Sequence, residues 1–493
     1  MSRLCLVTGA TGYVGGRLVP ELIAAGHKVR ILVRHPERVS QMPWRDKVEI
    51  FPGDANNPDS LSVAMQGVDV AYYMIHSIGS VGDFEKLELE TANTFATCAK
   101  RAGVQRIVYL GGLQNDKKLS KHLRSRAEVG NIFLKSGVPT IAFGAAVILG
   151  SGSLSFEMLR YLTERLPAMI TPRWVRTRIQ PIAIRDVLRY LVEAASLKAE
   201  LNRTFDIGGP DVLTYEQMMQ GYAKVAGLRK RIILPINLLS PGLSSRWIGL
   251  VTPVPKAIAR PLVDSLKTEV VCAEDDIKTY IPDPPEGLLN FEDAVRLAVQ
   301  RVRDAAVTTR WSSASMPGAP SDPLPTDPAW AGGSLYTDER EVAAKSSASA
   351  LWQVIERIGG ENGWYSFPLA WETRGLLDRI FGGPGLRRGR RNPDRLVAGE
   401  TVDFWRVEEC DRGHLLRLRA EMKMPGLAWL ELEVRPQEDG SVNYHQRAIY
   451  HPRGLAGHIY WWSVWPFHGI VFGSMVKNIT QAARNIDTAK VQH

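Results

Sequence analysis

A glycine-rich turn close to the N-terminus constrains the fold of this chain more than any other feature. Gly9, Gly12 and Gly15 follow an apolar run at residues 4–7 and precede a helical pattern that begins near Arg17. Where a buried strand turns through glycines into a helix, the backbone can approach a pyrophosphate, whose charge the exposed N–H groups and the helix dipole favour. The turn therefore predicts a dinucleotide-binding domain. The residues expected to contact the nucleotide there are Gly9, Thr11, Gly12, Tyr13, Val14 and Gly15.

The end of the second predicted strand indicates which dinucleotide is bound. This strand, at residues 28–33, is followed by Arg34, whereas an acidic residue at this position bonds the ribose hydroxyls of NAD. An arginine pairs instead with the 2′-phosphate of NADP. We therefore expect NADP(H) as the cofactor, with NAD(H) less favoured and with Arg38 as a second candidate contact. The alternative is that Arg34 is an ordinary solvated arginine at a strand end.

Strand-like and helical patterns alternate along the first part of the chain. Further strands are expected near residues 48–51, 68–75, 106–110 and 139–143, with helical patterns between them. Such alternation predicts an α/β fold, a doubly wound parallel sheet with helices on both faces. Ligands of these sheets bind at the carboxyl ends of the strands. Candidate residues at those ends are Asp54, for the adenine amino group, together with Ala55, Ile75, His76, Ser77 and Gly111.

These motifs resemble those of a known family. The opening motif that ends at Gly15, the Gly53-Asp54 pair and the segment FDIGGP at residues 205–210 are similar to extended and atypical short-chain dehydrogenases/reductases. More narrowly, the chain resembles the branch that contains the NADPH-binding accessory subunit of respiratory complex I and the fungal nitrogen-regulator redox sensors. The resemblance covers residues 1–303 and implies a Rossmann domain that binds NADP(H), followed by a smaller lobe on the substrate side.

The catalytic positions of that family are altered in this chain. Active members carry a Tyr-x-x-x-Lys pair, in which the tyrosine exchanges the substrate proton and the lysine holds the nicotinamide ribose. His122 stands at the tyrosine position here and Arg126 at the lysine position. We expect Arg126 to bond the ribose, and His122 is one candidate proton donor near neutral pH. His76 with Ser77, and Tyr109, are the other candidates. The alternative is that His122 is a solvated surface residue.

Composition restricts the compartment and the partners. The chain has 493 residues and a formal net charge of +9, without a motif for nucleic-acid binding. The first strand follows residues 1–3 directly, so we expect no signal peptide and a cytoplasmic protein, or one peripheral to the inner face of the membrane. The cysteines are too widely spaced to predict a disulfide framework or a metal site. They are Cys5, Cys98, Cys272 and Cys410.

A change of composition divides the chain. Residues 312–320 are rich in Ser, Pro, Gly and Ala and lack an apolar period, which is typical of an exposed linker. Beyond them, apolar and charged residues alternate at residues 416–424 and 430–435. This alternation predicts an antiparallel sheet with one buried and one solvated face. The expected organisation is a Rossmann domain at residues 1–230, a small substrate-side lobe at 231–305, a linker at 306–332 and an α+β domain at 333–490.

The C-terminal domain resembles a second group of proteins. A helix, antiparallel strands that include residues 402–409 and 442–450, and a long apolar segment at the end are similar to the helix-grip architecture of proteins that bind lipids. The segments at residues 403–407, 420–426 and 451–455 resemble an uncharacterised bacterial domain of the DUF2867 type. These resemblances imply a domain that binds a hydrophobic small molecule.

The apolar segment at residues 459–476 has two interpretations. Its tryptophans favour a membrane interface, whereas Pro466, His468 and Gly469 interrupt it. We therefore favour a lid over a pocket, with peripheral membrane contact as the alternative and no true membrane span. The arginines at residues 387–391 are either a contact for lipid headgroups or phosphate, or part of a solvated loop.

Two functions are compatible with these patterns. The first is an NADP(H)-dependent oxidoreductase that acts on a hydrophobic carbonyl compound. The second, suggested by the missing Tyr-x-x-x-Lys pair, is a non-catalytic NADP(H)-binding redox sensor or assembly factor whose C-terminal domain binds a lipid or isoprenoid. The sequence leaves the oligomeric state open.

Overall fold

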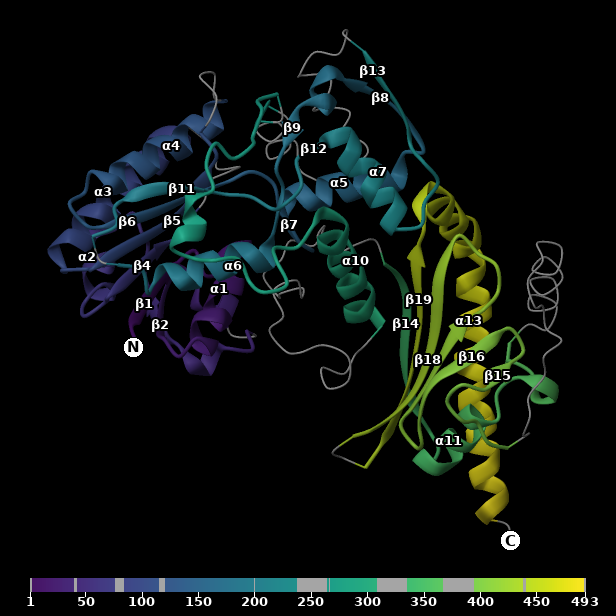
Figure 1. Ribbon diagram of the computed structural model, residues 1–493. Coiled ribbons are helices and arrows are strands. Elements are labelled where there is room, and N and C mark those ends of the chain that lie inside the picture. Colours follow the sequence, from purple (N-terminus) through teal and green to yellow (C-terminus); the bar gives the residue numbers. More distant parts are fainter. Residues whose placement is uncertain are drawn as a thin grey trace. The chain divides into compact units, whose positions relative to one another are not determined.

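The chain divides into two compact units. Figure 1 shows the computed structural model, which describes residues 2–39, 42–75, 84–114, 120–198, 200–236, 264–265, 267–307, 335–366, 394–437 and 440–491. Unit 1 comprises Met1–Gly333 and unit 2 comprises Ser334–His493. The predicted linker at 306–332 lies outside the described residues, apart from its first two positions, which end helix α10 (Phe291–Val307).

Unit 1 is built on a parallel sheet (Figure 1). Its seven strands follow the order β3, β2, β1, β4, β5, β6 and β11, and every neighbouring pair runs parallel. The central strands are almost wholly buried, as expected for a sheet covered on both faces. This confirms the predicted doubly wound α/β fold. The strands are β1 (Leu4–Thr8), β2 (Lys28–Val33), β3 (Glu49–Pro52), β4 (Val70–Tyr73), β5 (Arg106–Gly112), β6 (Thr140–Ala145) and β11 (Arg203–Ile207).

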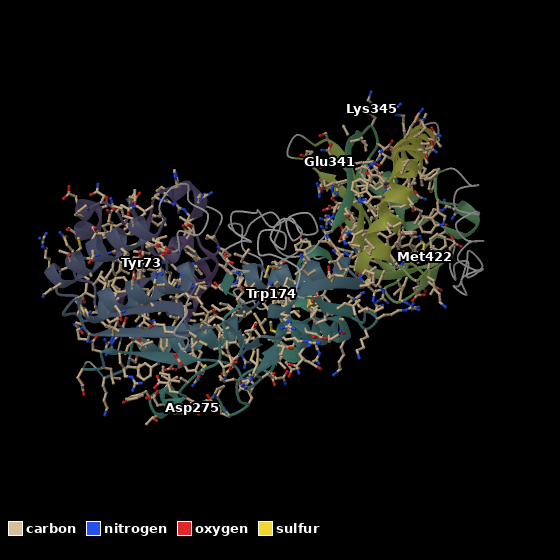
Figure 2. The ribbon with its side chains drawn as sticks, turned by 90° about the horizontal axis from the view of Figure 1, so that it is seen from above. Tyr73, Trp174, Asp275, Glu341, Lys345 and Met422 are labelled. Carbon is tan, nitrogen blue, oxygen red and sulfur yellow. The ribbon has the colours of Figure 1, made fainter. Side chains whose placement is uncertain are left out.

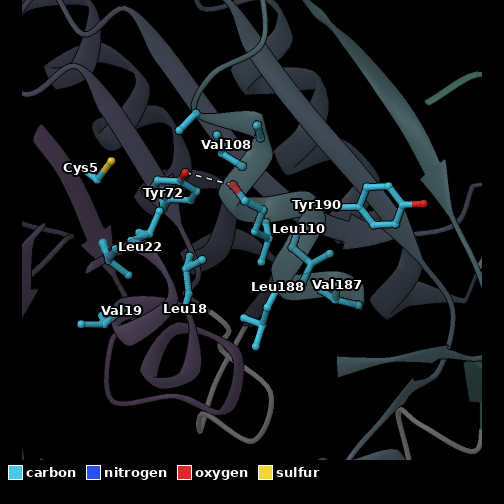
Figure 3. Packing of buried hydrophobic residues seen from close by; sticks show 14 of the residues in the cluster. Cys5, Leu18, Val19, Leu22, Tyr72, Val108, Leu110, Val187, Leu188 and Tyr190 are labelled. Atoms are coloured by element: carbon cyan, nitrogen blue, oxygen red, sulfur yellow. Dashed lines mark hydrogen bonds between the residues drawn. The ribbon is translucent and has the colours of Figure 1, made fainter. Parts of the chain in front are cut away.

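Helices pack on the two faces of this sheet, and two consecutive tyrosines of β4 show how. Tyr73, which is labelled in Figure 2, packs edge-to-face on Phe95 and Phe133 of α3 and α4. Tyr72 points to the opposite face, where its phenol donates a hydrogen bond to the carbonyl oxygen of Leu191 in α6 at 3.0 Å (Figure 3). The helices are α1 (Tyr13–Ala24), α2 (Pro58–Ala64), α3 (Phe84–Arg101), α4 (Lys121–Leu134) and α6 (Ile184–Ala194).

A smaller lobe of unit 1 has its own hydrophobic core. This core joins Met158 of α5 to Tyr215 and Tyr222 of α7 and to Val295 of α10. It draws on residues on both sides of position 230, so the predicted boundary there runs within one packed cluster. Around α5 (Leu154–Arg165), α7 (Tyr215–Val225) and α10 lie three two-stranded sheets. They pair β7 (Ile148–Leu149) with β10 (Ile182–Ala183), β8 (Ala168–Pro172) with β13 (Ile232–Ile236), and β9 (Arg178–Ile179) with β12 (Leu213–Thr214).

Unit 2 contains the predicted antiparallel sheet (Figure 1). Its six strands follow the order β14, β19, β18, β17, β16 and β15, with helices α11 (Ala348–Glu356) and α13 (Gly454–Val491) packed against it. No helix among the described residues combines the length and apolar composition needed to cross a membrane. The strands are β14 (Tyr336–Ala344), β15 (Thr401–Val402), β16 (Trp405–Asp411), β17 (Leu415–Ala420), β18 (Gly426–Pro436) and β19 (Val442–Pro452).

The prediction of one continuous strand in unit 2 is wrong, because the structure has two strands there. The sequence predicts a single strand at residues 402–409, but a tight turn at Asp403 separates β15 from β16. Asp403 has a φ of 53°, a left-handed conformation that aspartate tolerates better than most residues. Its carboxylate accepts hydrogen bonds from the indole N–H of Trp364 at 2.8 Å and the backbone N–H of Gly360 at 3.1 Å. The turn is therefore fixed by hydrogen bonds to residues that lie far from it in the sequence.

The two faces of this sheet differ as the alternation predicts. Apolar residues face α11 and α13, whereas the other face carries ion pairs. There the Glu431 carboxylate contacts the guanidinium groups of Arg417 and Arg447 at 2.8 and 2.7 Å. His445 lies between two further carboxylates, those of Glu339 at 2.7 Å and Glu433 at 3.3 Å.

The pKa values of His445 and Glu433 each shift in the direction that favours the charged form of the side chain. The Glu433 carboxylate, aided by that of Glu339, raises the pKa of His445 against the opposing effect of burial. Conversely, His445, followed by Arg435, lowers the pKa of Glu433 to about 2. The charged face is therefore a network of paired groups, in which His445 and Glu433 favour each other's charged form.

Candidate active site

The glycine turn of unit 1 exposes the start of a helix. Gly9 has a φ of 77°, and the backbone N–H of Gly12 donates a hydrogen bond to its carbonyl oxygen at 2.9 Å. Gly12 is the N-cap of α1, and no side chain among the described residues caps it. The first N–H groups of α1 are therefore available to an anion. Gly15 has a different role, because a Cβ on it would lie 2.3 Å from the carbonyl oxygen of Gly9.

A cavity of about 750 Å³ begins at this turn and extends to the smaller lobe. Gly15 does not line the cavity, so its absent side chain serves close packing of α1 against the turn. His76 and Ser77 lie outside the described residues. The predicted site residues that line the cavity are Gly9, Thr11, Gly12, Tyr13, Val14, Arg34, Asp54, Ala55, Ile75, Gly111, His122 and Arg126.

The ends of β2 and β3 supply the polar groups beside the turn. Arg34 is exposed, lines the cavity and forms no ion pair with any residue that the structure describes. The Asp54 carboxylate accepts hydrogen bonds from the backbone N–H of Asn56 at 2.9 Å and from its side-chain amide at 3.1 Å, which fixes the loop after β3. Arg38, the second candidate, does not line the cavity.

Helix α4 brings His122 and Arg126 to the same cavity. They are four positions apart in the sequence and therefore lie on one side of the helix. The guanidinium of Arg126 donates a hydrogen bond to the carbonyl oxygen of Leu110 in β5. Tyr109, another candidate proton donor, is buried and does not line the cavity; its phenol donates to the carbonyl oxygen of Arg126 at 3.1 Å. Burial raises the pKa of Tyr109 to about 12.

The far part of the cavity was not predicted from the sequence. Its wall includes Leu154 and Met158 of α5, Tyr215 of α7, and Val270. The only sequence signal near Tyr215 is the capping pattern from Thr214 onward, which indicates where a helix begins but not what its first residue faces.

The nucleotide turn and the smaller lobe meet directly. The guanidinium of Arg17, which is buried, stacks over the ring of Tyr13 at 4.1 Å from its centroid and donates a hydrogen bond to the carbonyl oxygen of Ser151 at 3.2 Å. A Cβ on Gly150 would lie 2.3 Å from the hydroxyl oxygen of Tyr13. The start of α1 is thus closely packed against the segment that precedes α5.

Comparison with known proteins agrees with this geometry. Residues 9–136 match the NAD(P)H-binding family, and residues 330–475 match DUF2867, a family of unknown function. The ceramide reductase of Caulobacter vibrioides is 28% identical over 250 residues, which cover 48% of this chain and 74% of that protein. The mitochondrial NADH dehydrogenase (ubiquinone) 1 alpha subcomplex subunit 9 of Mus musculus is 26% identical over 256 residues, 49% of this chain and 65% of that protein. Several other curated relatives match over only 30–33% of their own length.

Solved structures share the fold of unit 1. The triphenylmethane reductase of Citrobacter sp. has a TM-score of 0.50 at 21% identity, over 61% of this chain and 100% of that chain. The predicted nicotinamide-dinucleotide domain and the DUF2867 resemblance are thereby confirmed. The chain therefore carries an NAD(P)H-binding domain with a Rossmann fold followed by a DUF2867 domain, and the proteins it is similar to include reductases and dehydrogenases.

Proposed function

We propose that this protein is an NADP(H)-dependent oxidoreductase that reduces a hydrophobic carbonyl compound. The observation that carries the proposal is the single cavity of about 750 Å³ that joins the glycine turn and Arg34 to an apolar wall in the smaller lobe. NADPH, when bound, supplies a hydride to the carbonyl carbon; the oxygen takes up one proton, and the products are an alcohol and NADP⁺. The remaining steps belong to residues of this chain.

Residues at the turn and on α4 suit this chemistry. The open N–H groups of α1 bind the pyrophosphate, and Arg34 pairs with the 2′-phosphate, which favours NADPH over NADH. Arg126, held by the Leu110 carbonyl, donates to the nicotinamide ribose. His122 lines the cavity and donates the proton that the substrate oxygen needs.

The cavity wall and one relative support a hydrophobic substrate. Leu154, Met158 and Val270 offer the ligand apolar surface in the smaller lobe. The relative from Caulobacter vibrioides is named for the reduction of ceramide. These observations support the proposal that the substrate is an apolar carbonyl compound.

Turnover of defined carbonyl compounds tests the proposal. Purified protein is mixed with NADPH and either benzylacetone or dodecanal, and both NADPH oxidation and alcohol formation are measured. His122→Ala should lower the rate by about 10²–10⁴-fold, whereas Arg124→Ala, an exposed change on the same helix, should leave it unchanged. If NADPH binds but no carbonyl compound accelerates its oxidation, the non-catalytic sensor or assembly factor becomes the better description.

A second proposal concerns unit 2: the exposed face of α13 contacts a lipid surface. Ile459, Trp462, Phe467 and Ile470 are each 60–63% exposed. No charged residue interrupts the sequence from 454 to 476, and Arg453 precedes it. Exposed tryptophan and phenylalanine on an uncharged helix face suit the interface of a bilayer, and the adjacent arginine suits anionic headgroups.

Vesicle sedimentation tests this second proposal. The full-length protein should sediment with vesicles of phosphatidylcholine and phosphatidylglycerol, and the double substitution Trp462→Ser/Phe467→Ser should abolish this. Val397→Ser removes an exposed apolar residue elsewhere in unit 2 and serves as the control. A parent protein that stays in the supernatant contradicts the proposal. The predicted lipid or isoprenoid ligand of unit 2 is tested separately, by mass spectrometry of an organic extract of the purified protein.

A further inference from the structure

Tyr215 brings a phenol to the apolar part of the cavity. Its side chain is 1% exposed and belongs to the cavity wall. The hydroxyl oxygen is buried and has no hydrogen-bond partner among the residues that the structure describes. Buried hydroxyl groups in folded proteins are almost always hydrogen-bonded, so this one calls for a partner other than the described residues, such as a bound ligand.

The position of this phenol is fixed by its surroundings. The backbone of Tyr215 follows a capping box, in which the Thr214 hydroxyl accepts from the Gln217 N–H at 3.1 Å and the Gln217 side chain accepts from the Thr214 N–H at 2.7 Å. The ring packs edge-to-face on Trp174, with centroids 5.6 Å apart (Trp174 is labelled in Figure 2). The protein itself therefore holds the start of α7 and the ring of Tyr215 in place. A specific polar contact with a ligand requires such a fixed position.

The neighbours of Tyr215 restrict what it can bind. Met158 and Val270, which share its hydrophobic core, also line the cavity. The cationic side chains among the described lining residues, Arg34 and Arg126, belong to the sheet domain rather than to this lobe. Burial raises the pKa of Tyr215, so the phenol keeps its proton and acts as a donor. A neutral acceptor on an apolar molecule fits this environment better than a carboxylate or phosphate.

We infer that Tyr215 is the residue that recognises the substrate oxygen, by donating a hydrogen bond from its phenol to the carbonyl group of an otherwise apolar ligand. The inference rests on the proposed reductase function and specifies its substrate contact. A carbonyl oxygen has two lone pairs, so one accepts from Tyr215 while the other receives the proton from His122. The contact also polarises the carbonyl group toward hydride addition.

A matched pair of ligands tests this contact. Benzylacetone and butylbenzene differ in that a carbonyl group replaces one methylene, and their affinities for the NADP⁺-loaded protein can be measured by calorimetry. The parent protein should bind benzylacetone more tightly than butylbenzene. Tyr215→Phe should weaken benzylacetone binding by roughly 3- to 10-fold and leave butylbenzene binding unchanged, because one neutral hydrogen bond is lost and the ring remains. The rate of benzylacetone reduction should fall as well.

Tyr222→Phe is the control for this substitution. Tyr222 lies on the same helix, is fully buried, donates to Glu164 at 2.5 Å and does not line the cavity, so its loss should not change the preference for benzylacetone. If Tyr215→Phe weakens the binding of benzylacetone and of butylbenzene equally, the tyrosine serves packing alone and the inference is overturned. Parental binding and turnover in Tyr215→Phe would overturn it while the reductase proposal stands. A parent protein that neither binds nor reduces benzylacetone and dodecanal would overturn both.

Discussion

In the glycine turn, Gly15 approaches Gly9 so closely that a Cβ on Gly15 would lie 2.3 Å from the Gly9 carbonyl oxygen. A Cβ on Gly12 would meet that same oxygen at 3.2 Å and nothing nearer. Gly12 lines the cavity and Gly15 does not. The two glycines, three residues apart, are therefore required for different reasons.

Substitutions of Gly12 and Gly15 should have different effects, one on NADPH binding and the other on stability. Gly12→Val fills the space that the pyrophosphate needs, so NADPH binding should be lost, by at least ~100-fold, while the protein stays folded. Gly15→Ala forces α1 away from the turn and should lower the free energy of unfolding by about 1–3 kcal/mol. Calorimetric titration with NADPH and thermal unfolding measure the two effects. Parental affinity in Gly12→Val would show that the pyrophosphate lies elsewhere.

Arg34 should decide between the two nicotinamide dinucleotides. Loss of a hydrogen-bonded charge pair costs about 1.5–3 kcal/mol, so Arg34→Glu should weaken NADPH binding by roughly 10- to 150-fold. The new carboxylate can bond the ribose hydroxyls, and NADH should then bind more tightly than NADPH. Arg45→Glu makes the same charge change at an exposed arginine outside the cavity wall and is the control. Equal affinities of the parent protein for NADPH and NADH would show that Arg34 does not select NADPH.

Unit 2 should fold without unit 1. It has its own hydrophobic core around Leu418, Leu430 and Phe472, and its sheet is complete within residues 336–452. Expressed alone from Ser334 to His493, it should unfold cooperatively, as followed by circular dichroism. In the full-length protein, Gly12→Val should leave its transition unchanged. An isolated unit that is insoluble or lacks a transition would show that the two units are interdependent.

The stability of unit 2 should depend on pH through His445 and Glu433. The raised pKa of His445 contributes stability that is complete below its usual value of 6.5 and is lost as the pH rises through the folded-state pKa. The pKa of Glu433, lowered to about 2, contributes stability that is present above its usual value of 4.5 and is lost as the pH falls toward 2. Unit 2 should therefore be most stable between pH 4.5 and 6.5.

A substitution isolates the upper part of this profile. His445→Gln cannot titrate, so the decrease in thermal midpoint above pH 6.5 should disappear. Thermal unfolding of the full-length parent and variant across this range provides the comparison. The same decrease in both proteins would assign the pH dependence to other groups.

Much of unit 1 follows from local sequence alone. The strands β1, β2 and β5 are short apolar runs, and the turn before α1 needs its glycines whatever surrounds it. These features depend on neighbours within a few residues, so periodicity and turn chemistry identify them. The cavity position of Arg34 also follows, because a residue at the carboxyl end of a parallel strand lies at the edge where ligands bind.

Other features depend on contacts between distant residues. The turn at Asp403 is fixed by the indole of Trp364, 39 positions earlier, and no local pattern announces it. Tyr215 reaches the cavity only because the smaller lobe folds α7 against α5. Gly15 belongs to the nucleotide motif, yet its role is packing, which only the position of Gly9 reveals. Sequence patterns specify elements, whereas these roles arise from how the elements meet.

The contact between Tyr13 and Gly150 has an evolutionary consequence. Residue 13 begins the helix at the nucleotide turn, and residue 150 precedes the first helix of the smaller lobe. Since a methyl group at residue 150 would lie 2.3 Å from the Tyr13 hydroxyl, enlargement at one position demands reduction at the other. A lineage that acquires a new substrate by remodelling the smaller lobe must keep this glycine or first replace the tyrosine. The start of the nucleotide-binding helix and the entry to the smaller lobe are thereby constrained to change together.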